Sequence, residues 1–285
     1  MPHTSARDGT KLYYEEAGRG TPVVFVHEYA GDYRTWEPQM RYFSRFHRCV
    51  TYSQRGYPPS DVPDDAAKYG QDILRDDVIA LMDALKIDKA HIVGHSMGAA
   101  TALHVGIHFP QRCISVTAAG CGYGSSPDPK VVEASRAASR ETGRMFAAEG
   151  MEVAGTRYAD GATRQPQKYK DPRGYAHFVK MLTEHSALGH SMTMLHVQAK
   201  RPTLWDMEAD LKKFTPPLLV LVGDEDDWCL DASVFLKRTV PTAGLVVIPR
   251  SGHTITSEEP AAFNAALADL IAAAEAGRWL AHKPG

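Results

Sequence analysis

A serine, an acidic loop and a histidine, in this order along the chain, are the residues that could perform chemistry. Ser96 is the centre of GHSMG (94–98), between a predicted strand at 90–93 and a predicted helix at 97–109. A glycine on each side of the turn lets strand and helix pack closely and projects the serine oxygen above the sheet. The helix N-terminus favours developing negative charge there. Alone, the pentapeptide would also fit an ordinary turn serine, but this context predicts a nucleophile.

A serine hydroxyl needs a general base at neutral pH. His253 lies in SGH (251–253), just after a predicted strand at 244–248, and imidazole is suited to moving protons. The acidic run GDEDD (223–227) directly follows a predicted strand at 218–222. An acid at the carboxyl end of a parallel strand lies at the same sheet edge as Ser96. Four consecutive acids leave the choice open, and the spacing Gly-x-x-Asp favours Asp226.

The elements that must position these residues alternate between short apolar strands and helical patterns. This alternation predicts an α/β fold with a mostly parallel central sheet and helices on both faces. Residues 121–210 lack an apolar strand and are too long for an ordinary connection. We interpret them as an inserted helical cap, with residues 1–120 and 211–285 forming the core. Further helices are expected at 131–148, 174–188, 231–238 and 260–276.

The composition is that of a globular protein. The chain has 285 residues, of which 44% are apolar and 23% charged, with a net charge of −2. These values argue against a disordered or fibrous chain, and the lack of basic excess argues against nucleic acid as a partner. No apolar run is long enough to span a membrane, and the polar N-terminus predicts no secretory signal. Four scattered cysteines suggest reduced thiols in a cytoplasmic protein.

These motifs together resemble the α/β-hydrolase superfamily, in the branch with a serine nucleophile and a helical cap. The resemblance rests on GHSMG (94–98), GDED (223–226), GHTITSEEP (252–260) and SQRGYPPSD (53–61). It implies that Ser96 is the nucleophile, Asp226 the acid and His253 the base. Two departures, Ser53 for the family's frequent Asp and Pro58 for its Gly, affect loop shape. A serine nucleophile also argues against dehalogenase or epoxide hydrolase chemistry, because those relatives use an aspartate.

The resemblance further implies an oxyanion hole and draws attention to an unusual acid. The sequence HEY (27–29) stands where the family usually has His-Gly-x, and the x residue and the residue after the serine donate backbone amides. Carried over, the donors are the amides of Tyr29 and Met97. Glu28 replaces the glycine and brings a carboxylate near the hole. Either it points outward or braces a loop, or it positions substrate or water.

Three further sets of residues could serve the site or could simply pack the protein. Trp228 follows the acid by two residues and could form a wall of the pocket. Six methionines between 145 and 207 could line a substrate pocket or simply pack the cap against the core. His104 and His108 have the i, i+4 spacing of metal ligands, but no third ligand is evident, so packing is the preferred interpretation. No metal or organic cofactor is expected, and the zinc pattern Cys-x-x-Cys does not occur.

The resemblance implies transfer of an acyl group to water, with a small carboxylic ester or lactone as substrate. One alternative is C–C bond hydrolysis of a β-diketone-like or ring-fission substrate. Another, of a different class, is a ligand receptor or carrier on the same scaffold. Cofactor-free oxygenation or peracid formation is a minor option. The partner is thus a small molecule with an acyl group, and the sequence leaves the oligomeric state open.

Overall fold

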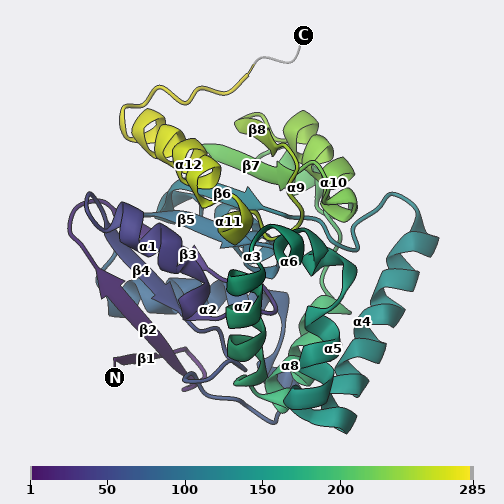
Figure 1. Cartoon of the computed structure of the whole chain (residues 1–285). Coiled ribbons are helices and arrows are strands. Elements are labelled where there is room, and N and C mark those ends of the chain that lie inside the picture. The colour runs from purple at the N-terminus through teal and green to yellow at the C-terminus, as the bar shows by residue number, and fades with distance from the viewer. Residues whose placement is uncertain (1, 283–285) are drawn as a thin grey trace.

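Eight strands form one sheet in the computed structural model, which describes residues 2–282 (Figure 1). Their order across the sheet is β1-β2-β4-β3-β5-β6-β7-β8. The pairs β1–β2 and β2–β4 are antiparallel and the remaining pairs are parallel, which confirms the predicted mostly parallel sheet. The strands are β1 (His3–Ser5), β2 (Lys11–Ala17), β3 (Pro22–Val26), β4 (Arg48–Tyr52), β5 (Ala90–His95), β6 (Cys113–Ala119), β7 (Leu218–Gly223) and β8 (Ala243–Ile248).

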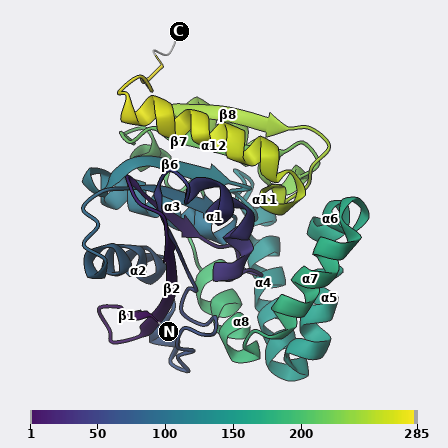
Figure 2. The same cartoon turned by 60° about the vertical axis from the view of Figure 1, so that its left-hand side comes forward.

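Helices cover both faces of the sheet because the central strands are apolar on both sides. In β5, Ile92 belongs to one buried cluster and Val93 to the other, as successive strand residues point to opposite faces. Of the helices with seven or more residues, three contribute to the Ile92 cluster and two contribute to the Val93 cluster (Figures 1 and 2). The first set is α2 (Gln71–Ala84), α3 (Met97–His108) and α10 (Asp227–Thr239); the second is α1 (Glu37–Phe43) and α12 (Pro260–Glu275).

A helical segment lies between β6 and β7 and forms a layer beside the sheet (Figures 1 and 2). We call residues 129–198 the insert. Its aromatic and aliphatic side chains, such as Phe146 and Leu182, share a buried cluster with Tyr29 and Met97 of the core. The insert contains α4 (Pro129–Gly150), η4 (Met151–Gly155), α5 (Thr156–Ala159), η5 (Ala162–Arg164), α6 (Gln165–Lys170), α7 (Pro172–Thr183), α8 (Ala187–Thr193) and η6 (Met194–Gln198).

Most element boundaries differ from the sequence prediction by one or two residues, and two predicted helices differ by more. Helix α10 begins at Asp227, four residues before the predicted start at 231, because Cys229, Ala232 and Leu236 form a buried stripe that the acidic run obscures. The predicted helix at 174–188 is two helices, α7 and α8, since the Ser186 side chain caps a new helix by accepting from the amide of Gly189. Two short helices also occur: α9 (Glu208–Leu211) precedes β7, and α11 (Ile255–Glu258) lies between β8 and α12. Within residues 2–282, no helix combines the length and apolarity needed to cross a bilayer.

The loop at 53–61 is anchored by a buried arginine. The Arg55 guanidinium donates to both carboxylate oxygens of Asp77 at 2.7 Å and to Asp8 at 2.8 Å. The next residue back, Gln54, donates its backbone amide to Nε2 of His27 at 2.9 Å. The other ring nitrogen of His27 therefore carries the proton and donates to the carbonyl of Glu28 at 2.6 Å. Loop 53–61 thus fixes the turn that follows β3.

Replacing Arg55 with methionine should lower the free energy of unfolding by about 3–5 kcal/mol, because the Asp77 carboxylate stays buried without its partner. The double variant Arg55→Met, Asp77→Leu should recover much of that loss. Denaturant unfolding followed by circular dichroism measures both. As a matched control, Arg41→Met removes an exposed pair with Glu37 and should cost less than about 1 kcal/mol. Equal losses at positions 55 and 41 would contradict the account.

Candidate active site

Ser96 occupies a sharp turn between β5 and α3. Its backbone has a φ of 52° and a ψ of −111°, a conformation that side-chain-bearing residues rarely adopt. Close packing explains why glycines flank it: a Cβ at Gly94 would lie 2.1 Å from the carbonyl oxygen of Gly98. A Cβ at Gly98 would lie 2.0 Å from the carbonyl oxygen of Val26 in β3. The turn therefore presents the Ser96 hydroxyl above the carboxyl end of the sheet.

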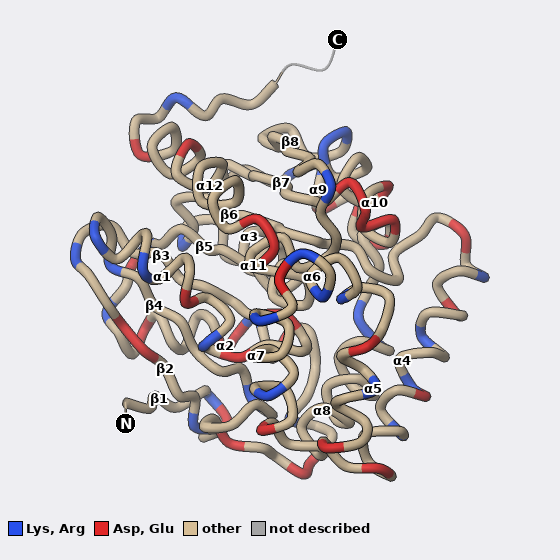
Figure 3. The backbone as a smooth tube through the Cα atoms, viewed as in Figure 1, with Lys and Arg blue, Asp and Glu red and all other residues tan. Residues whose placement is uncertain are grey.

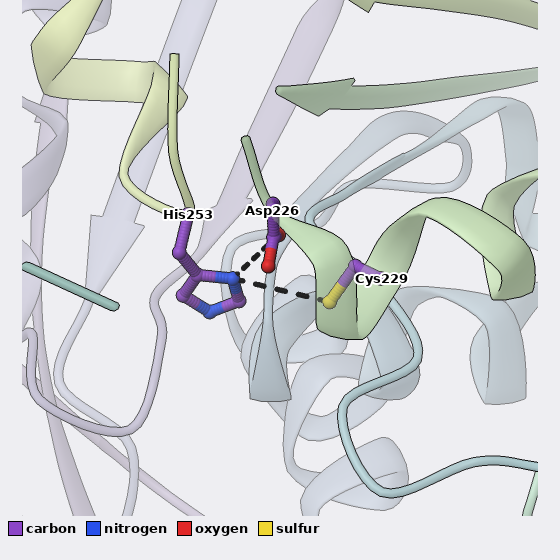
Figure 4. Close-up of side chains that lie close together, drawn as sticks. All are labelled: Asp226, Cys229 and His253. Atoms are coloured by element: carbon purple, nitrogen blue, oxygen red, sulfur yellow. Dashed lines mark hydrogen bonds and ion pairs between the residues drawn. The ribbon is translucent and has the colours of Figure 1, made fainter. Parts of the chain in front are cut away.

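The structure brings the serine, the histidine and one acid into a continuous hydrogen-bonded chain. The Ser96 hydroxyl lies 2.8 Å from Nε2 of His253, and Nδ1 of His253 lies 2.8 Å from Oδ2 of Asp226 (Figure 4 shows the histidine–aspartate pair). Because the carboxylate can only accept, Nδ1 carries the proton and donates to Asp226. Nε2 is then free to accept from the serine hydroxyl. This is the geometry in which a general base removes the proton of an attacking hydroxyl.

The structure also separates Asp226 from its acidic neighbours. Asp226 is buried, whereas Asp224, Glu225 and Asp227 are exposed. Burial alone would raise the pKa of Asp226, but the charge and hydrogen bond of His253 outweigh burial and lower the pKa below its usual value. An ionised Asp226 can therefore orient the imidazole and stabilise its protonated form.

His95 supports the backbone of His253. Its Nε2 donates to the carbonyl oxygen of His253 at 2.7 Å, and burial lowers the pKa of His95 to about 4. His95 thus remains neutral at physiological pH and holds the loop after β8 in place. We treat it as a positioning residue.

The thiol of Cys229 lies close to Asp226 and His253. The Sγ atom of Cys229, in the first turn of α10, lies 3.9 Å from Nδ1 of His253 and donates to the carbonyl of Gly120 (Figure 4). Asp226, Cys229 and His253 are the one group in residues 2–282 whose donor atoms lie close enough for a metal ion. All three donors are engaged in hydrogen bonds, and burial raises the pKa of the thiol well above its usual value. A metal would have to displace the proton that links His253 to Asp226.

The two amides expected at an oxyanion hole belong to Met97, the residue after the serine, and Tyr29, in the loop after β3. Met97 is the first residue of α3, and backbone amides in the first turn of a helix lack intrahelical partners. Tyr29 follows β3, and its side chain is buried, with the hydroxyl donating to the carbonyl of His190 at 3.1 Å. Tyr29 and Ser96 both line the same cavity.

Glu28 is buried and paired rather than turned outward. Its carboxylate accepts from both terminal nitrogens of Arg164, at 3.0 Å from Nη1 and in close contact with Nη2. Burial alone would raise the pKa of Glu28, but the positive charge of Arg164 brings it down to about 2. The carboxylate is therefore ionised, and the positive charge of Arg164 balances its negative charge. Arg164, which no motif in the sequence singles out, belongs to the insert, so this ion pair joins the insert to the turn after β3.

Ser96 and His253 open into a cavity of about 360 Å³ between the core and the insert. Trp228 lines it, although 57% of its surface is exposed, and its ring lies 5.4 Å from that of Tyr123. Of the six methionines considered, Met145 and Met194 line the cavity, whereas Met151 and Met192 are buried in the cluster that the insert shares with the core. His104 and His108 stack with their rings 5.9 Å apart, away from this cavity.

Comparison with known proteins agrees with this architecture. The chain is 39% identical over 97 residues to 3-oxoadipate enol-lactonase 1 of Acinetobacter baylyi, a match that covers 34% of this chain and about a third of that relative. It is 26% identical over 282 residues to 2-hydroxy-6-oxo-6-phenylhexa-2,4-dienoate hydrolase of Burkholderia cepacia, covering 92% of this chain and 91% of the relative. An enol-lactonase structure from Burkholderia xenovorans superposes with a TM-score of 0.82 at 22% identity, covering 95% of this chain and all of the other.

A match to a known family extends over most of the chain. Residues 23–266 match the alpha/beta hydrolase family, and this range contains Ser96, Asp226 and His253. Because the match extends over most of the chain, this protein belongs to the alpha/beta hydrolase family.

Proposed function

We propose that the protein hydrolyses a small carboxylic ester or lactone through an acyl-enzyme on Ser96. His253 takes the hydroxyl proton at Nε2 as the serine oxygen attacks the carbonyl carbon. The amides of Tyr29 and Met97 stabilise the resulting oxyanion. The proton then passes from His253 to the departing alkoxide, which leaves as the alcohol. Asp226 orients the imidazole and stabilises its charged form throughout.

Water completes the cycle. His253 accepts a proton from water, which attacks the acyl carbon, and the serine leaves with that proton as the acid is released. The observation that carries the proposal is the uninterrupted hydrogen-bonded chain from Ser96 through His253 to Asp226, which opens into a cavity of about 360 Å³. The cavity lies under the insert, which we propose acts as a cap that limits substrate size and excludes water.

The choice of ester or lactone draws support from the relatives. The enol-lactonase of Acinetobacter baylyi acts on a lactone by its name, and it resembles a third of this chain. The dienoate hydrolase of Burkholderia cepacia resembles nearly all of this chain and favours a second candidate, C–C bond hydrolysis. Both reactions use a serine, a base and an oxyanion hole. Ester hydrolysis is therefore tested with simple esters. C–C bond hydrolysis is tested with vinylogous diketones, which lack an ester bond.

Replacing Ser96 with alanine should reduce kcat for p-nitrophenyl acetate by at least about a thousandfold, because the nucleophile is removed while the cavity remains. Release of p-nitrophenolate measures the rate, and circular dichroism checks the fold. The variant Ser251→Ala serves as a control for the loss of a buried hydroxyl. The Ser251 hydroxyl donates to the carbonyl of Ile248 rather than to His253. Turnover that persists in Ser96→Ala would contradict the acyl-enzyme. No turnover of any ester by the folded wild type would instead favour a receptor or carrier.

Asp226→Asn should lower kcat by about a thousandfold to ten-thousandfold, because an amide no longer favours the imidazole tautomer that accepts from the serine. Glu225→Gln removes a neighbouring exposed acid from the same loop and should leave kcat within about twofold. Steady-state kinetics of both variants decides which acid serves His253. A larger loss in Glu225→Gln than in Asp226→Asn would reject the assignment of Asp226.

Arg164→Met should lower kcat for the same ester by at least about tenfold, because it leaves an unneutralised carboxylate beside the proposed oxyanion hole. Adding Glu28→Gly, which removes that carboxylate, should restore most of the activity. Arg144→Met controls for loss of an arginine from the insert, since Arg144 pairs with Glu141 at the surface. If the double variant is no more active than Arg164→Met, the charge of Glu28 does not matter to the reaction.

A further inference from the structure

The charges that line the cavity do not balance. Glu28 is the one acidic residue among the described lining residues, and Arg164 already neutralises it. Three arginines line the same cavity: Arg136, Arg157 and Arg201. Arg157 pairs with Glu149 at 2.9 Å, which leaves two guanidinium groups to account for.

Arg136 differs from the other arginines of α4. Arg140 pairs with Glu133 and Arg144 pairs with Glu141, and charges of both signs lie along this helix (Figure 3). Arg136 is half-buried, and among residues 2–282 it has no ion pair with a carboxylate. Its one hydrogen bond is a long one, 3.5 Å from Nη2 to the carbonyl oxygen of Arg201. Arg136 helps to lower the pKa of Asp206 through its charge, but within residues 2–282 it forms no ion pair with that carboxylate, and its side chain lines the cavity.

Arg201 is the second uncompensated charge. Its Nη2 donates to the carbonyl of Tyr123 at 2.7 Å, while Nη1 is enclosed and has no hydrogen-bond partner in the described part of the chain. Burial lowers the pKa of Arg201, and no carboxylate is among the groups that oppose this shift. A guanidinium stays protonated in proteins, so its charge remains. A partly buried charge without an ionic partner is costly, and such a group in the wall of a cavity is a candidate for contact with a ligand of opposite charge.

We propose that Arg136 and Arg201 bind a carboxylate carried by the substrate, so that the preferred substrate is a small anionic ester or lactone. The inference rests on the proposed ester hydrolysis and adds the chemical class of the substrate. A guanidinium group attracts a carboxylate by its charge and can donate hydrogen bonds to the carboxylate oxygens. Arg136, Arg201 and Ser96 line the same cavity, so one substrate in it could present its carboxylate to the arginines and its carbonyl to the serine. The dicarboxylic half-ester and the hydroxy-acid ester are the simplest substrates of this kind.

Matched ester pairs test the proposal. Monomethyl esters of glutarate, adipate and pimelate carry the carboxylate on the acyl side, and methyl esters of the monocarboxylic acids with the same chain lengths lack it. The acetyl ester of 4-hydroxybutyrate and butyl acetate form the corresponding pair for the alcohol side. Acid release in a pH-stat gives kcat/KM for each. We expect the anionic member of at least one pair to exceed its neutral match by at least about tenfold, and high salt to reduce that ratio.

Variants assign the preference to the two arginines. Arg136→Gln and Arg201→Gln should each lower the anionic-to-neutral ratio by at least about fivefold, and the double variant should bring it near one. Arg201→Lys keeps the charge and should retain part of the preference, which guards against a variant that merely disturbs the Tyr123 loop. Arg140→Gln, also on α4 but outside the cavity lining, should leave the ratio unchanged.

Two results would overturn the proposal. One is a wild-type enzyme that hydrolyses neutral esters as well as their anionic matches in every pair. The other is a loss of activity in the arginine variants that is equal for neutral and anionic esters, since this pattern indicates a purely structural role. Failure of the proposed function is distinguishable, because it would abolish turnover of neutral and anionic esters alike in the folded wild type.

Discussion

The hydrogen bond from Ser96 to His253 depends on the parallel order of neighbouring strands in the sheet. Ser96 follows β5, Asp226 follows β7 and His253 lies on the loop after β8. These strands are parallel, and β5, β6, β7 and β8 are adjacent, so their carboxyl ends meet along one edge. Residues 157 positions apart in the chain thereby come within 2.8 Å. A displacement of about 1 Å at such a contact would cost much of the rate, which is why buried groups such as His95 hold the loops.

The ion pair between Glu28 and Arg164 links that edge to the insert. The carboxylate lies next to Tyr29, whose amide we assign to the oxyanion hole, and the guanidinium comes from η5 of the insert. Neutralisation of Glu28 therefore requires the insert to be in place. One contact thus joins the insert to the core and balances the charge of Glu28 next to the oxyanion hole that we propose.

Sequence reasoning identified the parts of the site that depend on local pattern. The glycine-flanked Ser96, the position of His253 and the Gly-x-x-Asp spacing of Asp226 each lie within a few residues of a recognisable strand, and the sheet follows from alternating strands and helices. Arg164 could not be found in this way, because its partner lies 136 positions away and ion pairs leave no local signal. Similarly, only the structure shows that neither Arg136 nor Arg201 forms an ion pair with a carboxylate in residues 2–282. The acidic run hid the start of α10, because polar residues at a helix N-terminus resemble a loop. The division into core and cap at residues 121 and 210 stays a prediction.

The most direct test of the central claim is to capture the acyl-enzyme itself. The protein is mixed with p-nitrophenyl acetate, quenched with acid within the first turnovers, digested and mapped by mass spectrometry. The account predicts an acetyl group on the peptide that contains Ser96, and none on that peptide when His253 is replaced by alanine. Acetylation of any other residue in the first turnovers, with Ser96 unmodified while ester is being hydrolysed, would contradict it.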